Sequence, residues 1–388
     1  MNALASQRAV LWPAFAATAA IAGFAYLFLR VEAQWEVVAL TAGALVALLA
    51  LGRTRLGAAL GAAWSARPAP LAWGALLAAS VVVALFAEDH FALLMIATVL
   101  LYGVACLGLT IQFGYAGVVN FSGAAFFGVG GYTAAVLATH TALPHLLVVA
   151  AGGVLAGAIG SLLVLPLLRT RGHYAALITV AFAILFKTFL EVNDALGGPQ
   201  GLKVPGMRML GWSFNDNIAL GENTELSFYL SYAVFSLLLL AGALLLVRRL
   251  ERSWLGLSLD AVRIDETAAS VFGFEVARWK ILAFTLGNVL AGTAGAVYAM
   301  MTGFVAPASF TLAESLILVS IVILGGLGNP VGVLAATALV VVLPEKLQVI
   351  QEYRFLLFSG FVILVLLFRP EGLLPRKLRQ YLPGWGRA

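Results

Sequence analysis

Long apolar runs separated by short polar segments recur along the whole chain. An α-helix needs roughly 17 to 25 apolar residues to cross about 30 Å of hydrocarbon. Runs close to this length are candidate spans at 11–29, 35–52, 71–87, 91–112, 124–139, 146–168, 173–190, 227–247, 281–301, 315–325, 331–349 and 355–368. The short runs 124–139 and 315–325 are expected to be half-helices or re-entrant pieces. The pattern therefore predicts an all-α, polytopic membrane protein with ten to twelve transmembrane helices, some of them broken or re-entrant.

Composition agrees with this pattern. Hydrophobic residues make up 62% of the chain and charged residues 11%, whereas about 25% of the residues of soluble domains are charged. The net charge is +5, but the basic residues are scattered between apolar runs, so no nucleic-acid partner is expected. The single cysteine, Cys106, lies inside an apolar run and is expected to be a small core residue. Arg8 before the run 11–29 also fits a signal peptide, but an uncleaved first span is favoured because many spans follow.

The distribution of Lys and Arg predicts the orientation of the chain, because cytoplasmic loops carry an excess of both. Alternating spans from a cytoplasmic N-terminus place most basic clusters on one side. The opposite side receives Glu88, Asp89 and the 191–226 segment. We therefore expect N-terminal transmembrane spans at 1–90, a core at 91–375 with an external loop at 191–226 and a cytoplasmic loop at 248–280, and a cytoplasmic basic tail at 376–388.

The 248–280 segment is the most charged part of the chain, with six basic and five acidic residues. Apolar residues recur in it at helical spacing, at Leu257, Ala261, Ile264, Ala268 and Phe272. This spacing predicts one or two short amphipathic helices at the cytoplasmic surface. Such a helix either contacts a partner or is simply a solvated loop helix.

The stretch 114–132, "GYAGVVNFSGAAFFGVGGY", contains six glycines and no charge. It is not a nucleotide site: G-x-x-x-x-G-K-[ST] is absent from the sequence, and Gly128, Gly130 and Gly131 stand inside an apolar run. Two interpretations remain. Small residues four apart allow close helix packing in lipid, as in the pairs Ala124/Gly128, Gly130/Ala134 and Gly131/Ala135. Alternatively, a broken helix lines a cavity and places Asn120 and Ser122 at membrane depth.

Catalytic and metal-binding patterns are not found. The four histidines, His90, His140, His145 and His173, fall near loop ends, so no metal site is expected. Lys187 lies near the end of its span and either reaches the interface or faces a translocation path. Ion-coupled carriers usually have ionisable residues at mid-membrane. Their near absence here favours an external energy source over a secondary carrier.

Several segments together carry a resemblance to a known family. They are "GYAGVVNFSGAAFFGVGGY", "RTRGHYAALITVAFAILFK", "GGPQG", "LDAVRIDETAASVFGFEVARWKILAF", "LAGTAGAVYA", "VILGGLGNPVGVLAATALVVVLPE" and "FRPEGLLP". In this order, from about 91 to 375, they resemble the LivM-type permease of bacterial branched-chain amino-acid ABC importers. The resemblance implies the ABC importer permease fold and a multi-pass protein of the inner (plasma) membrane. It also implies a second, LivH-type permease, two ATPases that bind ATP and Mg, a periplasmic substrate-binding protein, and no cofactor or enzyme activity in this chain.

The resemblance further implies roles for particular residues. The 257–273 segment becomes the coupling helix that docks on an ATPase: Ala261, Ala268, Ala269 and Gly273 give it a narrow surface, and Arg263, Asp265 and Glu266 fix the register by paired charges. The expected translocation path contains Asn120, Ser122, Tyr132 and Lys187.

The chain departs from the family pattern at several positions. The family usually has Gly-His at Ser122 and Gly123, Asp at His173, Glu-x-x-Arg at Ile184 and Lys187, and Arg at Asp260. The residues that line a binding pocket determine which substrates it accepts. Because of these departures, an importer for urea, short amides or aromatic acids remains an alternative to one for branched-chain or other hydrophobic amino acids.

Overall fold

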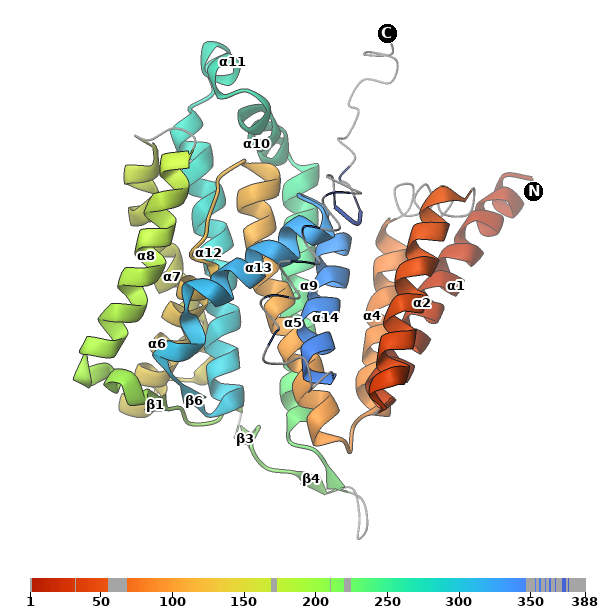
Figure 1. Ribbon diagram of the computed structural model, residues 1–388, viewed down its shortest axis with the longest axis horizontal. Helices are drawn as coiled ribbons and strands as arrows, with labels where there is room; N and C mark the ends of the chain where they lie inside the picture. Colours follow the sequence, from red (N-terminus) through yellow and green to blue (C-terminus); the bar gives the residue numbers. More distant parts are fainter. Residues whose placement is uncertain are drawn as a thin grey trace. The chain divides into compact units, whose positions relative to one another are not determined.

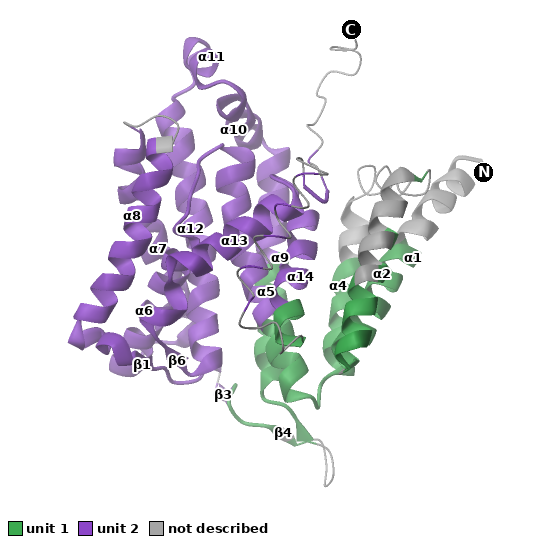
Figure 2. Cartoon of the chain, viewed as in Figure 1, with its two compact units in different colours: residues 1–97, 214–241, 342–352 green, residues 98–213, 242–341, 353–388 purple. Residues whose placement is uncertain are grey.

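The computed structural model describes residues 2–31, 33–54, 68–168, 173–209, 211–219 and 225–346, together with 353, 356, 360, 363, 367, 372–374 and 376 near the C-terminus. Helices dominate these residues (Figure 1). The chain forms two compact units (Figure 2). Unit 1 comprises 1–97, 214–241 and 342–352, and unit 2 comprises 98–213, 242–341 and 353–388. Most of the expected span 355–368 and of the expected tail lies outside the described residues.

Unit 1 contains the N-terminal helices and the first parts of two longer helices. Its elements are α1 (Asn2–Arg30), α2 (Gln34–Arg53), α4 (Pro68–Leu85), the start of α5 (His90–Thr110), β4 (Ile218–Ala219), β5 (Glu225–Leu226) and the start of α9 (Tyr229–Arg252). A small apolar core forms where Val82, Phe86 and Ala92 pack against Tyr26 and Leu29. The amide N–H of Ser227 donates to the Ala87 carbonyl at 2.9 Å. These contacts hold α1, α4 and α5 together within the unit.

Unit 2 contains the remaining elements. Its long helices are α6 (Gly123–His140), α7 (His145–Leu168), α8 (His173–Val192), α12 (Val276–Thr302), α13 (Leu312–Gly325) and most of α14 (Pro330–Lys346). Its shorter helices are the π turn η1 (Ile111–Tyr115), η2 (Asp194–Leu196), η3 (Gly198–Gln200), α10 (Trp254–Ile264), α11 (Glu266–Val271) and η4 (Pro307–Phe310). Its strands are β1 (Leu202–Lys203), β2 (Arg208–Met209), β3 (Trp212–Ser213) and β6 (Phe304–Val305).

The centre of unit 2 is the contact of α12 with α6 and α7 (Figure 1). Glycine allows the backbones to meet: a Cβ at Gly130 of α6 would overlap the carbonyl oxygen of Gly292 on α12, and a Cβ at Gly295 would overlap the carbonyl oxygen of Phe127. Close approach of this kind supplies the van der Waals contact that holds helices together in lipid. The close-packing interpretation of the glycine-rich stretch is therefore confirmed for Gly130.

Most helices agree with the predicted spans to within a few residues, with three exceptions. α1 begins at Asn2 instead of 11, α9 continues to Arg252, beyond the expected end at 247, and α12 begins at Val276 instead of 281. Arg249 and Arg252 lie in the last turn of α9, where positive charge stabilises a helix end. The expected cytoplasmic loop 248–280 is therefore shortened from both sides.

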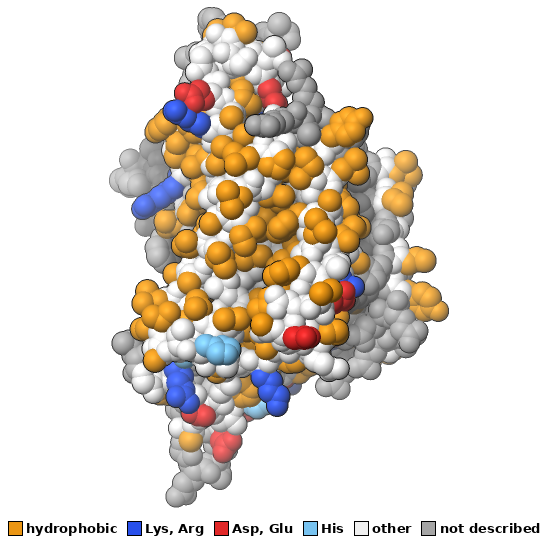
Figure 3. Space-filling model, turned by 90° about the vertical axis from the view of Figure 1, so that its left-hand side faces the viewer, with side chains coloured by type: hydrophobic (Ala, Val, Ile, Leu, Met, Phe, Trp, Pro, Cys, Tyr) orange, Lys and Arg blue, Asp and Glu red, His pale blue; other side chains and the backbone are white. Residues whose placement is uncertain are grey.

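Five described helices are long and apolar enough to cross a membrane: His90–Tyr115, His145–Leu168, Tyr174–Val192, Tyr229–Arg252 and Val276–Thr302. Shorter apolar helices are Phe15–Arg30, Gly74–Leu85 and Leu312–Gly325. The face of the molecule that unit 2 presents in Figure 3 shows hydrophobic side chains across its middle and most charged side chains toward its two ends. This distribution is the one expected of a helical membrane protein.

The segment between α8 and α9, expected to be an external loop, contains short 3-10 helices and strands. In its first part, β1 pairs with β6 in an antiparallel ladder, with Leu202 opposite Val305. Gly201 precedes β1 with a φ of +75° and lies against the backbone of Val305, where a side chain would overlap it. Glycine is therefore required at the point where the "GGPQG" turn meets β6.

Candidate functional site

The chain breaks its helical path between α5 and α6. α5 ends in the π turn η1, irregular backbone follows, and α6 begins at Gly123. Gly117 has a φ of +66°, which favours glycine, and a Cβ at Gly114 would lie within 2.4 Å of the Gly328 backbone. Unwound backbone at membrane depth needs protein cover. That cover is present, because Ile111, Tyr115 and Asn120 are fully buried.

Three amides and a hydroxyl, at Gln112, Asn120, Asn288 and Ser122, form one hydrogen-bonded group at this break. We call it the amide cluster. Gln112 Nε2 donates to Asn288 Oδ1 at 2.9 Å, and Asn120 Nδ2 donates to Gln112 Oε1 at 2.8 Å. Asn120 Oδ1 accepts from the Ser122 amide at 2.9 Å and from its hydroxyl at 2.6 Å. These side chains are at most 1% exposed, so the cluster ties the broken helix to α12 without a buried charge.

The amide cluster includes two residues that sequence reasoning missed. Both Gln112 and Asn288 are polar residues within apolar spans, and this position was the sequence signal that could have identified them. Gln112 also donates to the Phe284 carbonyl at 3.0 Å. A helix break was one of the two interpretations that the sequence left open, and it is present, but Asn120 and Ser122 are 0% exposed and meet protein groups instead of an open cavity. Membership of the translocation path stays a prediction for both.

The other two predicted path residues lie elsewhere. Tyr132, on α6, is 4% exposed and packs edge to face against Phe310, with ring centroids 5.9 Å apart. Lys187, on α8, forms an ion pair with Glu191 at 3.1 Å, and both side chains are 37% exposed. The structure therefore brings Asn120 and Ser122 together but does not join Tyr132 or Lys187 to them.

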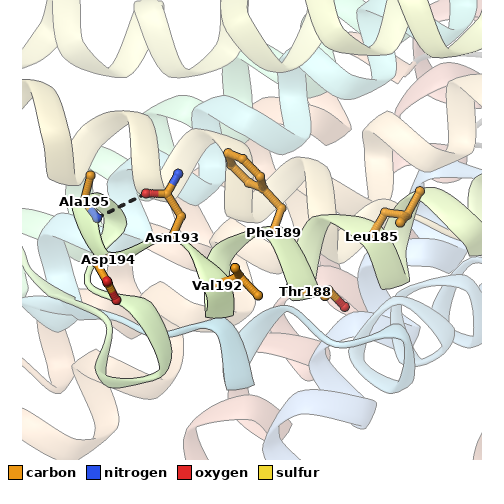
Figure 4. A pocket seen from close by; sticks show the side chains of 7 residues that line it. All are labelled: Leu185, Thr188, Phe189, Val192, Asn193, Asp194 and Ala195. Carbon is orange, nitrogen blue, oxygen red and sulfur yellow. Dashed lines mark hydrogen bonds between the residues drawn. The ribbon is translucent and has the colours of Figure 1, made fainter.

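A hollow of about 620 Å³ lies against the end of α8. Leu185, Phe189 and Val192 of α8 line it together with the Asn193 turn that follows (Figure 4). The Asn193 side-chain oxygen accepts from the Ala195 amide at 3.1 Å (Figure 4). The lining is therefore mainly apolar, and this amide oxygen is engaged in a local turn.

The predicted amphipathic segment forms two helices, α10 and α11, which meet at Asp265. The Asp265 carboxylate caps α11 by accepting from the amides of Thr267 and Ala268 at 2.9 and 3.0 Å. N-terminal capping of this kind fixes where a helix begins. The segment is thus a pair of short helices, as the pattern allowed, and not one continuous coupling helix over 257–273.

The charges of this segment are engaged within the chain. Arg263 Nη1 donates to the Gly114 carbonyl at 2.8 Å, and Lys280 Nζ donates to Glu266 Oε1 at 2.6 Å. Together with the Asp265 cap, these contacts assign internal partners to all three residues that were expected to pair with an ATPase. Alternating charge on a short segment indicates ion pairing, but it does not reveal whether the partner lies inside or outside the chain.

The small residues of the segment are divided between its two sides. Ala261 is half-buried and Ala269 is 5% exposed, whereas Ala268 and Gly273 are exposed. Gly273 has a φ of +84°, and a Cβ added there would meet no atom within 4 Å. Val271 and Phe272, just before it, are 80% and 81% exposed. These two form an apolar tip at the far end of α11 that the expected narrow surface did not include.

Arg376, which was expected to begin the basic tail, is part of the folded core of unit 2. Its side chain is 7% exposed and pairs with Asp260 of α10. It also lies over the Tyr115 ring, with Cζ 4.1 Å from the ring centroid. A basic residue next to others in sequence indicates a cytoplasmic location, but this one has a specific buried partner.

Metal ligands do not gather in the part of the chain that the structure describes: no group of three or more His, Cys, Asp or Glu side chains lies close enough together to hold an ion. The polar groups at the helix break are three side-chain amides, a hydroxyl, two arginines and the Asp260 carboxylate that pairs with Arg376. This set can form and break hydrogen bonds between helices, and it supplies neither a nucleophile with its base nor a metal centre.

Comparison with known proteins places the site within a described family. Residues 91–367 match the family described as the permease component of the branched-chain amino acid transport system. This range includes the amide cluster, α10, α11 and the helices that pack around them.

Individual relatives carry related names. The chain is 35% identical over 289 residues to the high-affinity branched-chain amino acid transport system permease protein LivM of Escherichia coli K12, covering 71% of this chain and 68% of that protein. The Salmonella typhimurium LivM is 34% identical over 302 residues, with coverage of 74% and 71%. The E. coli K12 permease LivH is 24% identical over 292 residues, with coverage of 71% and 91%. No solved structure matches the chain.

Proposed function

The chain belongs to the family of branched-chain amino acid transport permeases, and we propose that it is the membrane permease subunit of an ATP-driven ABC importer for branched-chain or other hydrophobic amino acids. The observation that carries this proposal is the identity of 35% to a LivM permease over 289 residues. The described helices make the chain a multi-pass membrane protein, and we place it in the bacterial inner membrane.

Partner subunits supply the energy in this proposal. The sequence has no G-x-x-x-x-G-K-[ST] motif, which is the loop that cradles the phosphates of ATP in such ATPases. ATP and Mg therefore bind to two separate ATPase subunits, and this chain is a transport subunit without its own nucleotide site. A periplasmic binding protein delivers the substrate. The similarity to LivH as well as to LivM supports a second, homologous permease as partner.

Transport in such a complex requires a contact that passes movement from the ATPases to the membrane helices. The α10–α11 pair suits this role because its apolar tip, Val271 and Phe272, is exposed while its charges are engaged internally. Arg263 joins α10 to the Gly114 carbonyl within η1. Displacement of the tip by ATP-driven closure of the ATPases would thus act on the break between α5 and α6.

We propose that the hydrogen bonds of the amide cluster change during transport. In this structure its hydrogen bonds close the broken helix against α12. Neutral amides can exchange such partners at modest free-energy cost, since interhelical hydrogen bonds in membranes contribute only about 0.6 kcal/mol on average. We propose that opening of this cluster accompanies the change between outward and inward access.

Substrate identity is tested with the binding protein and with uptake. The cognate periplasmic protein should bind leucine, isoleucine or valine in calorimetry, and proteoliposomes that contain the complete complex should accumulate labelled leucine when ATP is enclosed. Binding of urea, a short amide or an aromatic acid, with no binding of leucine, would favour the alternative substrate class.

A further inference from the structure

Arg376 lies between the proposed coupling helices and the break in the membrane helix. We propose that Arg376 is a positioning residue, a latch that carries displacement of α10 to η1 and from there to the amide cluster. This inference rests on the proposed docking role of α10 and α11. It assigns a role in transport to a residue near the C-terminus, 116 positions away from its partner Asp260 in sequence.

One side of the latch is an ion pair with α10. Arg376 Nη1 and Nη2 donate to the two carboxylate oxygens of Asp260 at 2.6 and 2.8 Å. The side chains are 7% and 13% exposed, and the Glu251 carboxylate lies 3.8 Å from Arg376 Nε. Two parallel hydrogen bonds from a planar guanidinium fix direction as well as distance. A buried pair of this geometry makes α10 and the arginine move together.

The other side of the latch is the π turn. Arg376 Nη1 also donates to the Gly114 carbonyl at 3.2 Å, and the guanidinium lies 4.1 Å from the centroid of the Tyr115 ring. Gly114 and Tyr115 follow Gln112 of the amide cluster within the same turn of η1. The contacts therefore run without interruption from α10 through Arg376 and η1 to the hydrogen bonds that close the broken helix.

The base of the latch is anchored on α13. The Leu373 amide donates to the Leu324 carbonyl at 2.8 Å. Gly328, with a φ of +84°, gives the arginine stem its space, because a Cβ there would lie 2.6 Å from Arg376 Cδ. Leu373 is thus held at the end of α13, and the Arg376 guanidinium reaches across to α10 and η1.

This arrangement predicts what the loss of the latch does. The apolar tip of α11 is not part of the latch, so the ATPases still bind and still hydrolyse ATP. Movement of α10 would still reach η1 through Arg263, which donates to the same Gly114 carbonyl at 2.8 Å, but without the paired contact of Arg376 with Asp260. A smaller fraction of the hydrolysis cycles would then result in transport, so the ratio of substrate moved to ATP consumed falls.

The test measures this ratio in the complete importer, reconstituted in liposomes with its partner subunits and with labelled leucine as probe. Arg376→Gln and Asp260→Asn should retain the ATPases on purification and keep ATP hydrolysis within about twofold of wild type. Leucine moved per ATP should fall about 5-fold or more, the lower end of typical coupling between sites. Their combination should cost no more than either single variant, because both remove one interaction.

Two further variants separate a latch from a general need for charge. Arg376→Lys keeps the charge but loses the paired, planar geometry, so its ratio of leucine moved to ATP consumed should resemble that of Arg376→Gln. If Arg376→Gln does not assemble, Arg376→Lys tests the latch in its place. Arg278→Gln is the matched control, since its ion pair with Glu275 is 78% and 60% exposed in the same region, and its ratio should equal that of wild type.

The outcomes distinguish this inference from the proposed function. If the wild-type complex shows no ATP-driven leucine uptake, the proposed function fails. If the wild type transports leucine, and the Arg376 and Asp260 variants leave the ratio unchanged or lower uptake and hydrolysis in equal proportion, the latch is wrong.

Discussion

Replacing Asn120 by leucine tests the amide cluster more sharply than any other single change. Leucine has a similar size, so the site stays filled, but it can neither donate nor accept a hydrogen bond. Asn120 takes part in four described hydrogen bonds, two to other side chains of the cluster as donor and two from Ser122 as acceptor. The substitution therefore isolates hydrogen bonding from packing.

The expected loss of stability follows from the groups left without a partner. The substitution leaves Gln112 Oε1, the Ser122 amide and the Ser122 hydroxyl unpaired in a site that is 0% exposed. Interhelical hydrogen bonds in membranes contribute about 0.6 kcal/mol on average, and leaving a buried polar group unpaired costs about 1–3 kcal/mol. Three groups at the lower ends of these magnitudes, about 0.6 to about 1 kcal/mol each, predict a decrease of about 2–3 kcal/mol in the free energy of unfolding. For a unit of this size that corresponds to a melting temperature lower by roughly 5–10 °C.

Cys106 provides the assay. It is the single cysteine of the sequence and is 0% exposed, within the part of α5 that belongs to unit 2. A thiol-reactive dye that fluoresces on coupling therefore reports opening of this unit as the purified protein is heated in detergent. Wild type and variant are compared at the same heating rate, and labelled leucine uptake is measured on the same preparations.

Thr188→Leu is the matched control for the asparagine substitution. It also replaces a polar residue of a membrane helix by leucine, but Thr188 is exposed and its hydroxyl donates within α8, to the Ile184 carbonyl at 3.0 Å. Its melting temperature should stay within about 2 °C of wild type. If Asn120→Leu melts within the same margin, the hydrogen bonds of the cluster do not stabilise the fold, contrary to this prediction.

Three other substitutions give direct outcomes. Gly130→Ala inserts a methyl group where α6 meets the backbone of α12 and should lower the free energy of unfolding by about 1–3 kcal/mol or more. Gly242→Ala, with open space around it, should not lower it. An equal effect of both in the thiol assay would contradict the close packing of α6 on α12. Phe272→Glu removes an apolar side chain that docking would bury, and burial of such a side chain contributes about 1.5–3 kcal/mol. The affinity for the ATPase, measured by its retention on purification, should therefore fall about 10- to 100-fold, whereas Trp212→Glu should leave it unchanged. Full retention by Phe272→Glu would contradict docking on the apolar tip. As a predicted path residue, Lys187→Gln should lower uptake at an unchanged melting temperature, because an exposed ion pair contributes less than about 1 kcal/mol; normal uptake would remove it from the path.

The sequence predicted most helices because the length of an apolar run is set by local physics. The runs 124–139 and 315–325 became α6 (Gly123–His140) and α13 (Leu312–Gly325) with ends moved by three residues at most. The break before α6 was also visible, since Asn120 and glycines interrupt the apolar pattern. Hydrophobic periodicity and turn chemistry depend on neighbouring residues in the sequence, so they can be interpreted without knowledge of the fold.

The partners of polar residues were not predictable in the same way. Gln112 meets Asn288 across 176 positions, and Arg376 meets Asp260 across 116. Nothing in either local pattern indicates such a distant partner. The local pattern around Arg263 also does not indicate a partner within the chain, so Arg263 was expected to pair with another subunit. Its partner is the Gly114 carbonyl, 149 positions away. Long-range hydrogen bonds depend on how the helices pack, which local spacing does not encode.

ATP-driven import is tested most directly by leucine uptake into proteoliposomes under two conditions. Liposomes that contain the complete complex, the periplasmic protein and enclosed ATP should accumulate labelled leucine, and should stop when ATP is replaced by a non-hydrolysable analogue. Liposomes that contain this chain alone, with a proton or sodium gradient and no ATP, should show no accumulation. Uptake by the chain alone, driven by the ion gradient, would identify a secondary carrier and would contradict the account.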